Sequence, residues 1–343
     1  MTSAFKTSMR AATAICTAVL LVACNGAAVE EPPEAEGEAP EAATQEETDQ
    51  SELLIGVSLP GINEYVDAVI QAYEEMAADL GNVELQILSA DFDVAAELGN
   101  VEDLIAAGVD GIIFWPTDPD TGVNVVETIL AADIPVVANN NPVGDQEEVY
   151  PGLLAFVGRN DVAEAEQIAT WISETLGERD ANVVMMQGAL GSSPQIRREA
   201  GFLNVLGDDP RINIVAEPGV ADWSTEGAIA NMEDIVQRTT DIQVIYNHAP
   251  AFATVTAEVA RDGGVDMDDL LVTGIDFDTV IQRGFEEGIV DATMYYDQSL
   301  EGSEAVRALV EYLREGVEPA NRWIQPPAEL LTQENFQDYE PTF

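Results

Sequence analysis

The amino-acid sequence predicts an α/β protein whose folded part consists of two doubly wound lobes, each built on a parallel β-sheet. Three observations carry this prediction. Short apolar runs alternate with amphipathic helical stretches from residue 53 onward, the same order recurs in the second half, and matching segments lie 130 to 132 residues apart. A chain of 343 residues, 46% of them hydrophobic, is long enough for two domains of about 100–200 residues each.

The first half begins with a continuous apolar run at residues 53–58, which is typical of a buried parallel strand. Helical periodicity follows at 66–80 and 95–107, and a glycine ends each of these stretches. The same patterns predict further strands at 83–89, 111–115 and 134–138 and a helix at 122–132. Strands and helices in this order favour a sheet covered by helices on both faces.

The second half repeats this order. The predicted strands lie at 182–187, 212–217, 243–246 and 270–275, and the predicted helices at 196–206, 225–237 and 251–262. The segment at 101–105 matches that at 232–236, and two further pairs match at almost the same separation. One long, repeated offset indicates two domains of one architecture and not a solenoid of short repeats.

Residues 1–23 are typical of an export signal. Lys6 and Arg10 precede an apolar run at 11–22 that is shorter than the ~20 residues needed to span a bilayer. The run ends in Leu-Val-Ala before Cys24, a pattern that resembles a bacterial lipobox and implies cleavage before Cys24 and its lipidation. The alternative is an ordinary signal peptide that contains an incidental cysteine.

Residues 24–52 are predicted to form a lipidated cysteine followed by an acidic, disordered linker. The stretch at 25–52 holds ten acidic residues and no basic residue, and alanine, proline and glutamate make up most of it. Such a segment cannot bury a core, and its like charges keep it extended. We therefore expect a folded body tethered to the cell membrane through lipid alone.

The chain carries 64 acidic and 13 basic residues, a formal net charge of −51. This charge excludes nucleic acid and anionic membrane surfaces as partners, and it favours a neutral ligand over an anionic one. The two cysteines, Cys16 and Cys24, both lie near the N-terminus, so the folded part has no disulfide and no cysteine metal site. The sequence contains no Gly-rich phosphate loop, and we expect no cofactor and no metal.

Polar and aromatic residues follow the predicted strands, where ligands of doubly wound sheets bind. Asparagine and aspartate pair with adjacent hydroxyls, arginine donates in a fixed fork, and aromatic faces cover the C–H side of a sugar ring. The alternatives are helix caps, core aromatic residues and an arginine in an ordinary ion pair. The candidates are Asn63, Tyr65, Asn140, Asn141, Arg198, Trp223, His248 and Asp276.

The segments at 55–81, 107–118, 134–137, 187–202, 221–223 and 273–276 together resemble the ribose/galactose-type periplasmic sugar-binding proteins. These are substrate-binding components of ABC sugar importers with the type I periplasmic binding protein fold. The resemblance implies a three-segment hinge, near 157–159, 294–297 and 326–330. It also implies an N-terminal lobe at 53–157 plus 297–325 and a C-terminal lobe at 158–296 plus 326–343.

The resemblance implies ligand-binding roles that the sequence matches in part. Asn63 and Tyr65 stand where the family has a polar residue and a stacking aromatic residue, and Trp223 matches a second stacking position. Arg198 matches an arginine that grips sugar oxygens, and Asp276 an acid that accepts from sugar hydroxyls. The departures are Asn140-Asn141 in place of an Asp-Arg pair, His248 in place of Asn, and Tyr296 in place of a hinge Gln. They favour a different sugar, a polyol or a furanose-like signal over ribose.

We therefore expect a monomeric, lipid-anchored, extracytoplasmic solute-binding protein, in the periplasm or at the cell surface. It would capture a small neutral sugar or polyol and deliver it to the permease subunits of an ABC importer. The alternative is a signalling receptor for a furanose-like autoinducer or a chemosensory ligand. An enzyme dependent on Asp276 or His248 is disfavoured, because no catalytic set is visible around the single histidine.

Overall fold

The computed structural model describes residues 51–144 and 148–342. The predicted signal segment, Cys16, Cys24 and all but the end of the predicted linker lie outside the described residues. No helix in the described part of the chain is long and apolar enough to cross a membrane.

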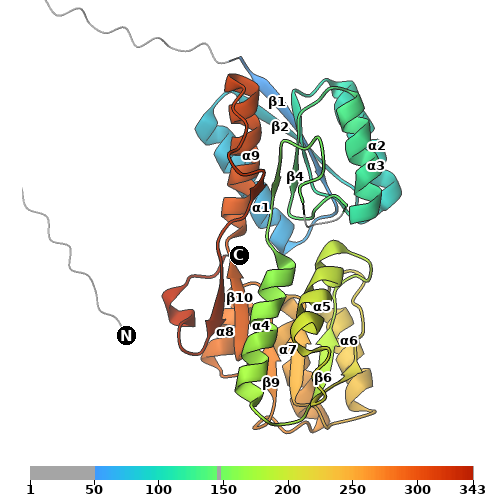
Figure 1. Ribbon diagram of the computed structural model, residues 1–343, viewed down its shortest axis with the longest axis vertical. Coiled ribbons are helices and arrows are strands. Elements are labelled where there is room, and N and C mark those ends of the chain that lie inside the picture. The colour runs from blue at the N-terminus through green and yellow to red at the C-terminus, as the bar shows by residue number, and fades with distance from the viewer. Residues whose placement is uncertain (1–50, 145–147, 343) are drawn as a thin grey trace, which may run out of the picture. The chain divides into compact units, whose positions relative to one another are not determined.

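The N-terminal lobe is built on a six-stranded, fully parallel sheet in the order β11-β5-β4-β3-β1-β2. Its strands are β1 (Leu53–Leu59), β2 (Val83–Ser89), β3 (Gly111–Phe114), β4 (Val136–Asn139), β5 (Ala155–Val157) and β11 (Trp323–Ile324). Its helices are α1 (Glu64–Leu80), α2 (Val94–Ala107), α3 (Pro119–Ala131) and α9 (Gln298–Glu315). Helices α1 and α9 pack together on one face of the sheet, and α2 and α3 on the other (Figure 1).

The C-terminal lobe repeats this plan in the order β12-β10-β9-β8-β6-β7. Its strands are β6 (Ala181–Met186), β7 (Ile212–Ala216), β8 (Val244–Asn247), β9 (Leu271–Thr273), β10 (Ala292–Tyr296) and β12 (Ala328–Thr332). Its helices are α4 (Asp161–Leu176), α5 (Ser193–Leu206), α6 (Thr225–Val236), α7 (Pro250–Gly263) and α8 (Thr279–Glu286), with a 3₁₀ turn at Phe336–Asp338. The edge strand β12 runs antiparallel to β10, and the other pairs are parallel.

The chain passes three times between the two lobes: from β5 to α4, from β10 to α9, and from β11 to β12. Helix α9 therefore belongs to the N-terminal lobe although it follows five strands of the other lobe. These features confirm the predicted fold class of two doubly wound lobes joined by a three-segment hinge.

Several helices begin earlier than their apolar periodicity predicts, because their first turns carry polar residues or proline in place of apolar residues. Helix α3 begins at Pro119 and not at 122, since Asp118 Oδ1 accepts from the backbone N–H groups of Asp120 and Thr121. Helix α5 begins at Ser193 and not at 196, with Pro194 in its first turn. The spacing of apolar residues identifies only the buried side of a helix. Residues of the first turn that lie outside this side are therefore missed, and the predicted helix starts too late.

Candidate functional site

A cavity of about 590 Å³ opens between the two lobes at the carboxyl ends of their strands. The doubly wound fold predicts a ligand site at this edge of each sheet. The N-terminal lobe contributes residues that follow β1, β2, β3 and β4, and the C-terminal lobe contributes residues from the 189–194 loop, α5 and the ends of β7, β8 and β9.

Seven of the nine residues predicted from sequence line this cavity. They come from both lobes: Asn63, Tyr65, Asn140 and Asn141 from the N-terminal lobe, and Arg198, Trp223 and Asp276 from the C-terminal lobe. The remaining two, His248 and Tyr296, are fully buried and are not among the lining residues.

His248 lies behind the wall of the cavity. Its ring meets the Tyr246 ring edge-on at a centroid distance of 5.2 Å, and neither ring nitrogen has a hydrogen-bond partner among the described residues. Burial, together with the charge of Arg198, holds the pKa of His248 well below its usual 6.5, so the imidazole is neutral. Its backbone carbonyl accepts from an Arg198 Nη atom, and through this bond His248 helps to hold the arginine.

Aromatic rings enter the cavity from both lobes. Trp223 and Phe92 line it from opposite lobes, and both have left-handed backbone conformations, with φ of 56° and 61°. Each ring lies against a glycine that has no room for a side chain: a Cβ on Gly188 would lie 1.9 Å from the Trp223 ring, and one on Gly61 would lie 2.2 Å from Phe92. Strained backbone of this kind collects at functional sites.

The N-terminal wall carries a further aromatic pair. The Tyr65 ring meets the Trp115 ring in a T-shaped arrangement with centroids 6.0 Å apart, and both residues line the cavity. Sequence analysis missed Trp115, which it assigned to the end of a strand, and it missed Phe92. Both residues follow a strand: Trp115 comes directly after β3, and Phe92 follows β2. Searching the residues after every strand end would therefore have identified both.

A buried ion-pair network lies beneath the C-terminal wall. Arg159, in the first crossing segment, contacts the carboxylates of Glu164 and Asp276 and lies 3.7 Å from Asp161. Arg198 Nε donates to Asp161 Oδ1 at 2.7 Å. All five side chains are at most 7% exposed, so each charge depends on its neighbours and not on water.

Tyr296 belongs to the supports of this network. The guanidinium carbon of Arg159 lies 4.5 Å above the centre of the Tyr296 ring, which is cation–π geometry. Burial raises the pKa of Glu164 to about 7, against the opposing charge and hydrogen bonds of Arg159. Sequence analysis assigned Arg159 no role, because the residues next to an arginine in the chain do not show whether its side chain is buried.

A buried carboxylate lies beneath the N-terminal wall. Glu301, in the first turn of α9, has no exposed surface. Its Oε1 accepts from Asn139 Nδ2 at 2.9 Å, and its Oε2 accepts from Asn140 Nδ2 at 3.1 Å and from the Tyr65 hydroxyl at 3.2 Å. Glu301 thus holds two residues of the cavity wall, and no feature of the sequence distinguishes it from the chain's other acidic residues.

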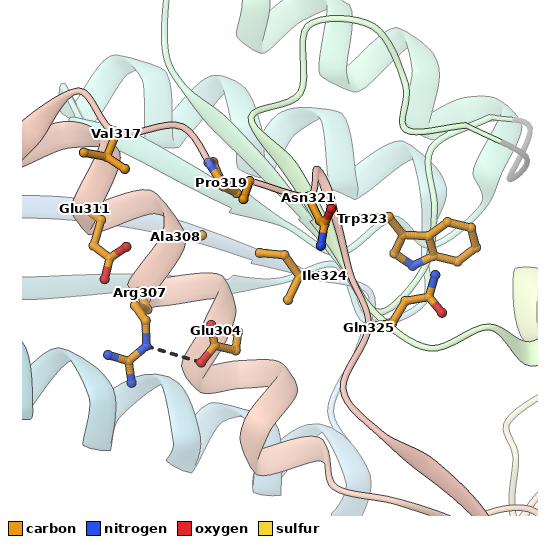
Figure 2. A pocket seen from close by; sticks show the side chains of 11 residues that line it. Glu304, Arg307, Ala308, Glu311, Val317, Pro319, Asn321, Trp323, Ile324 and Gln325 are labelled. Atoms are coloured by element: carbon orange, nitrogen blue, oxygen red, sulfur yellow. Dashed lines mark hydrogen bonds and ion pairs between the residues drawn. The ribbon is translucent and has the colours of Figure 1, made fainter.

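A second cavity, of about 360 Å³, lies on the N-terminal lobe between α9 and the segment that leads into β11 (Figure 2). Arg307 and Glu304 form an ion pair at 3.3 Å on its wall, and Trp323 and Gln325 close another side. None of the predicted ligand residues lines it. In the described part of the chain, no group of three or more histidine, cysteine or acidic side chains is arranged to hold a metal ion.

Comparisons with known proteins agree with this geometry. A family model described as periplasmic binding protein domain matches residues 55–316. The ribose import binding protein of Bacillus subtilis is 26% identical over 284 residues, which cover 83% of this chain and 88% of that protein.

Two solved structures have the same architecture. An ABC transporter solute binding protein from Bacillus halodurans with bound myo-inositol has a TM-score of 0.78 at 25% identity, and the match covers 86% of this chain and 100% of that one. An ABC transporter solute binding protein from Mycobacterium smegmatis with bound glycerol has a TM-score of 0.76 at 25% identity, covering 85% and 99%.

Proposed function

The chain belongs to the periplasmic binding protein family, and from this premise we propose that it captures a small neutral sugar or polyol between its lobes and delivers it to the permease subunits of an ABC importer. Members of this family bind solutes outside the cytoplasm and are not enzymes. The relatives named for ribose import and solved with myo-inositol or glycerol support a polyhydroxylated ligand.

The observation that carries this proposal is the pairing of aromatic rings and polar side chains on both walls of one cavity. Trp223 on one lobe and Tyr65 with Trp115 on the other offer flat faces to the C–H side of a sugar ring. The walls also carry the amide of Asn140, the carboxylate of Asp276 and the guanidinium of Arg198, and these groups form hydrogen bonds with ligand hydroxyls. An aliphatic ligand would leave these polar groups without partners.

We assign direct ligand contact to seven residues: Asn63, Tyr65, Asn140, Asn141, Arg198, Trp223 and Asp276. His248 and Tyr296 act indirectly in this proposal, the first by holding Arg198 and the second by supporting Arg159. On binding, the lobes close by rotation about the three crossing segments, as lobed binding proteins do. We propose for the two lobes the boundaries expected from the sequence, 53–157 plus 297–325 and 158–296 plus 326–343.

A scan by thermal unfolding against neutral sugars and polyols tests the ligand class, because a bound ligand raises stability by mass action. We expect myo-inositol or a related polyol or sugar to raise Tm in the wild type and to lose this effect in D276N. The control D262N changes an exposed carboxylate outside the cavity and keeps the shift. Absence of a shift with every compound in the panel contradicts the proposal.

We also propose that the mature protein is a monomer anchored outside the cytoplasm through a lipid on Cys24, with residues 1–23 removed and residues 24–52 as the linker. Mass spectrometry of the mature N-terminus tests this. A diacylglyceryl-modified Cys24 in the wild type and release of C24A from membranes support the anchor, with C16A as a control that stays bound. An unmodified N-terminus, or equal membrane binding of C24A, contradicts it.

A further inference from the structure

The hydrogen bonds around Glu301 engage the side-chain hydrogens that Asn140 and Tyr65 could otherwise donate to a ligand. The Asn140 amide has two hydrogens: one goes to the Tyr65 hydroxyl oxygen at 3.0 Å and the other to Glu301 Oε2 at 3.1 Å. The single hydroxyl hydrogen of Tyr65 also goes to Glu301. Asn140 therefore has only its carbonyl oxygen to offer a ligand, and Tyr65 has no hydrogen to donate.

The neighbouring residues continue this pattern. Asn141 Nδ2 donates to the backbone carbonyl of Pro116 at 2.8 Å, and Asn141 Oδ1 is buried with no partner among the described residues. On the opposite wall, Asp276 accepts by nature, and one of its oxygens is already held by Arg159. The donor among these residues is Arg198, of which Nε and one Nη are engaged by Asp161 and His248.

We propose that Glu301 is a positioning residue that makes Tyr65 and Asn140, on the N-terminal wall of the cavity, present hydrogen-bond acceptors to the ligand, and so selects ligands that donate hydroxyl hydrogens to these two residues. This inference rests on the proposed function and specifies its ligand class. The class is a fully hydroxylated cyclitol or sugar with adjacent free hydroxyls. Sugar acids, and ligands whose hydroxyls toward the N-terminal wall are alkylated or otherwise substituted, are excluded. Their oxygen atoms would face the acceptor atoms of the wall with no hydrogen between them.

The electrostatics around Glu301 make this arrangement dependent on pH. Burial raises the pKa of Glu301 to about 7, against hydrogen bonds from Asn140 and Tyr65 and the charge of Arg159. A protonated Glu301 donates one hydrogen, so that Asn140 or Tyr65 must turn and present a donor to the cavity.

The titratable and charged groups that face Glu301 are Tyr65, Tyr73, Tyr296 and Arg159. Burial raises the pKa of the three tyrosines well above the usual 10, and nearby carboxylates keep the pKa of Arg159 well above its usual value despite its burial. These four groups keep one protonation state through neutral pH. Glu301 is thus the member of this group whose charge changes near pH 7.

Calorimetric titration with myo-inositol tests the proposal in the wild type, in E301Q, and in the control E315Q, which changes an exposed residue on the same helix. A lost hydrogen bond to a charged or oriented group weakens binding about tenfold or more. We expect the wild-type Kd to rise about tenfold from about pH 8.5 to about pH 5.5. E301Q binds at least about tenfold more weakly at the higher pH and has a shallower pH dependence than the wild type, whereas E315Q matches the wild type.

A second measurement needs no variant. Replacing one hydroxyl of inositol by fluorine keeps its size but removes the donated hydrogen. Fluorinated inositols whose altered position faces the N-terminal wall bind about tenfold more weakly than myo-inositol. Equal affinity for all fluorinated isomers, or a wild-type pH profile retained in E301Q, overturns the role of Glu301 and leaves the proposed function standing. A wild type that binds no polyol overturns both.

Discussion

Arg159 and Asp276 form a buried ion pair that joins the hinge to the ligand cavity. Arg159 lies in the first crossing segment, Asp276 lines the cavity after β9, and their side chains are 1% and 5% exposed. Asp276 has a left-handed backbone, with φ of 77°, and the arginine fixes one of its oxygens. This carboxylate of the cavity wall is therefore oriented by a residue of the first crossing segment.

Removing Arg159 is expected to destabilise the protein strongly. In R159M the carboxylates of Glu164 and Asp276 lose their opposing charge in a buried site, which costs about 3–5 kcal/mol of unfolding free energy. Urea denaturation measures this loss. The control R238M removes an arginine whose exposed pair with Asp234 contributes no more than about 1 kcal/mol. Equal losses in the two variants contradict the role of the network.

A methyl group on Gly188 is expected to impair binding without touching the ligand. The added Cβ of G188A would lie 1.9 Å from the Trp223 ring and displace it from the cavity wall. We expect G188A to reduce affinity for the bound polyol about as much as W223A does, in calorimetric titration. The control G99A, in α2, has open space around its Cβ and leaves affinity unchanged. Wild-type affinity in G188A contradicts the stacking role of Trp223.

The stability of the ligand-free protein is expected to fall as the pH rises from about 4.5 to about 7. Burial raises the pKa of Glu164 and of Glu301 from 4.5 to about 7, so the folded state holds protons that the unfolded state releases. Stability from these groups is fully present below their unfolded pKa and is lost as the pH passes the folded pKa. Denaturation midpoints measured across this range give a shallower slope for E301Q than for the wild type. Identical slopes contradict the raised pKa of Glu301.

Salt is expected to stabilise the protein. The formal charge from residue 53 onward is −43, and its self-repulsion opposes the compact state. Raising sodium chloride from about 0.1 M to about 1 M shortens the Debye length from about 10 Å to about 3 Å and screens this repulsion. We expect Tm to rise over this range in sodium chloride and equally in potassium chloride. A constant or falling Tm contradicts the prediction.

Most of the fold could be predicted from the sequence because the buried faces of helices and strands require apolar residues at regular spacings. Strand β2 has the predicted bounds, Val83–Ser89, and helix α6 ends one residue before its prediction. Helix α9 was not assigned, and one reason is that Glu301 and Gln298 occupy its buried side, where periodicity expects apolar residues. A polar side chain turned inward breaks the pattern on which the prediction depends.

The cavity residues could be listed from sequence because parallel strands bring their carboxyl ends to one edge. This rule places Asn140 and Asp276 on facing walls although they are 136 positions apart. It says nothing about what lies beneath the walls. Arg159 and Glu301 act from there, and their roles depend on burial and on partners far away in the chain, such as the Asn139 that contacts Glu301.

A crystal structure of the protein with the polyol that gives the largest thermal shift tests the central claim most directly. The account predicts a ligand ring against Trp223 in the cavity between the lobes, with hydroxyls donating to Asn140 Oδ1 and to Asp276. A ligand bound elsewhere, for example in the cavity beside α9 (Figure 2), or one that accepts hydrogen bonds from Asn140, would contradict it.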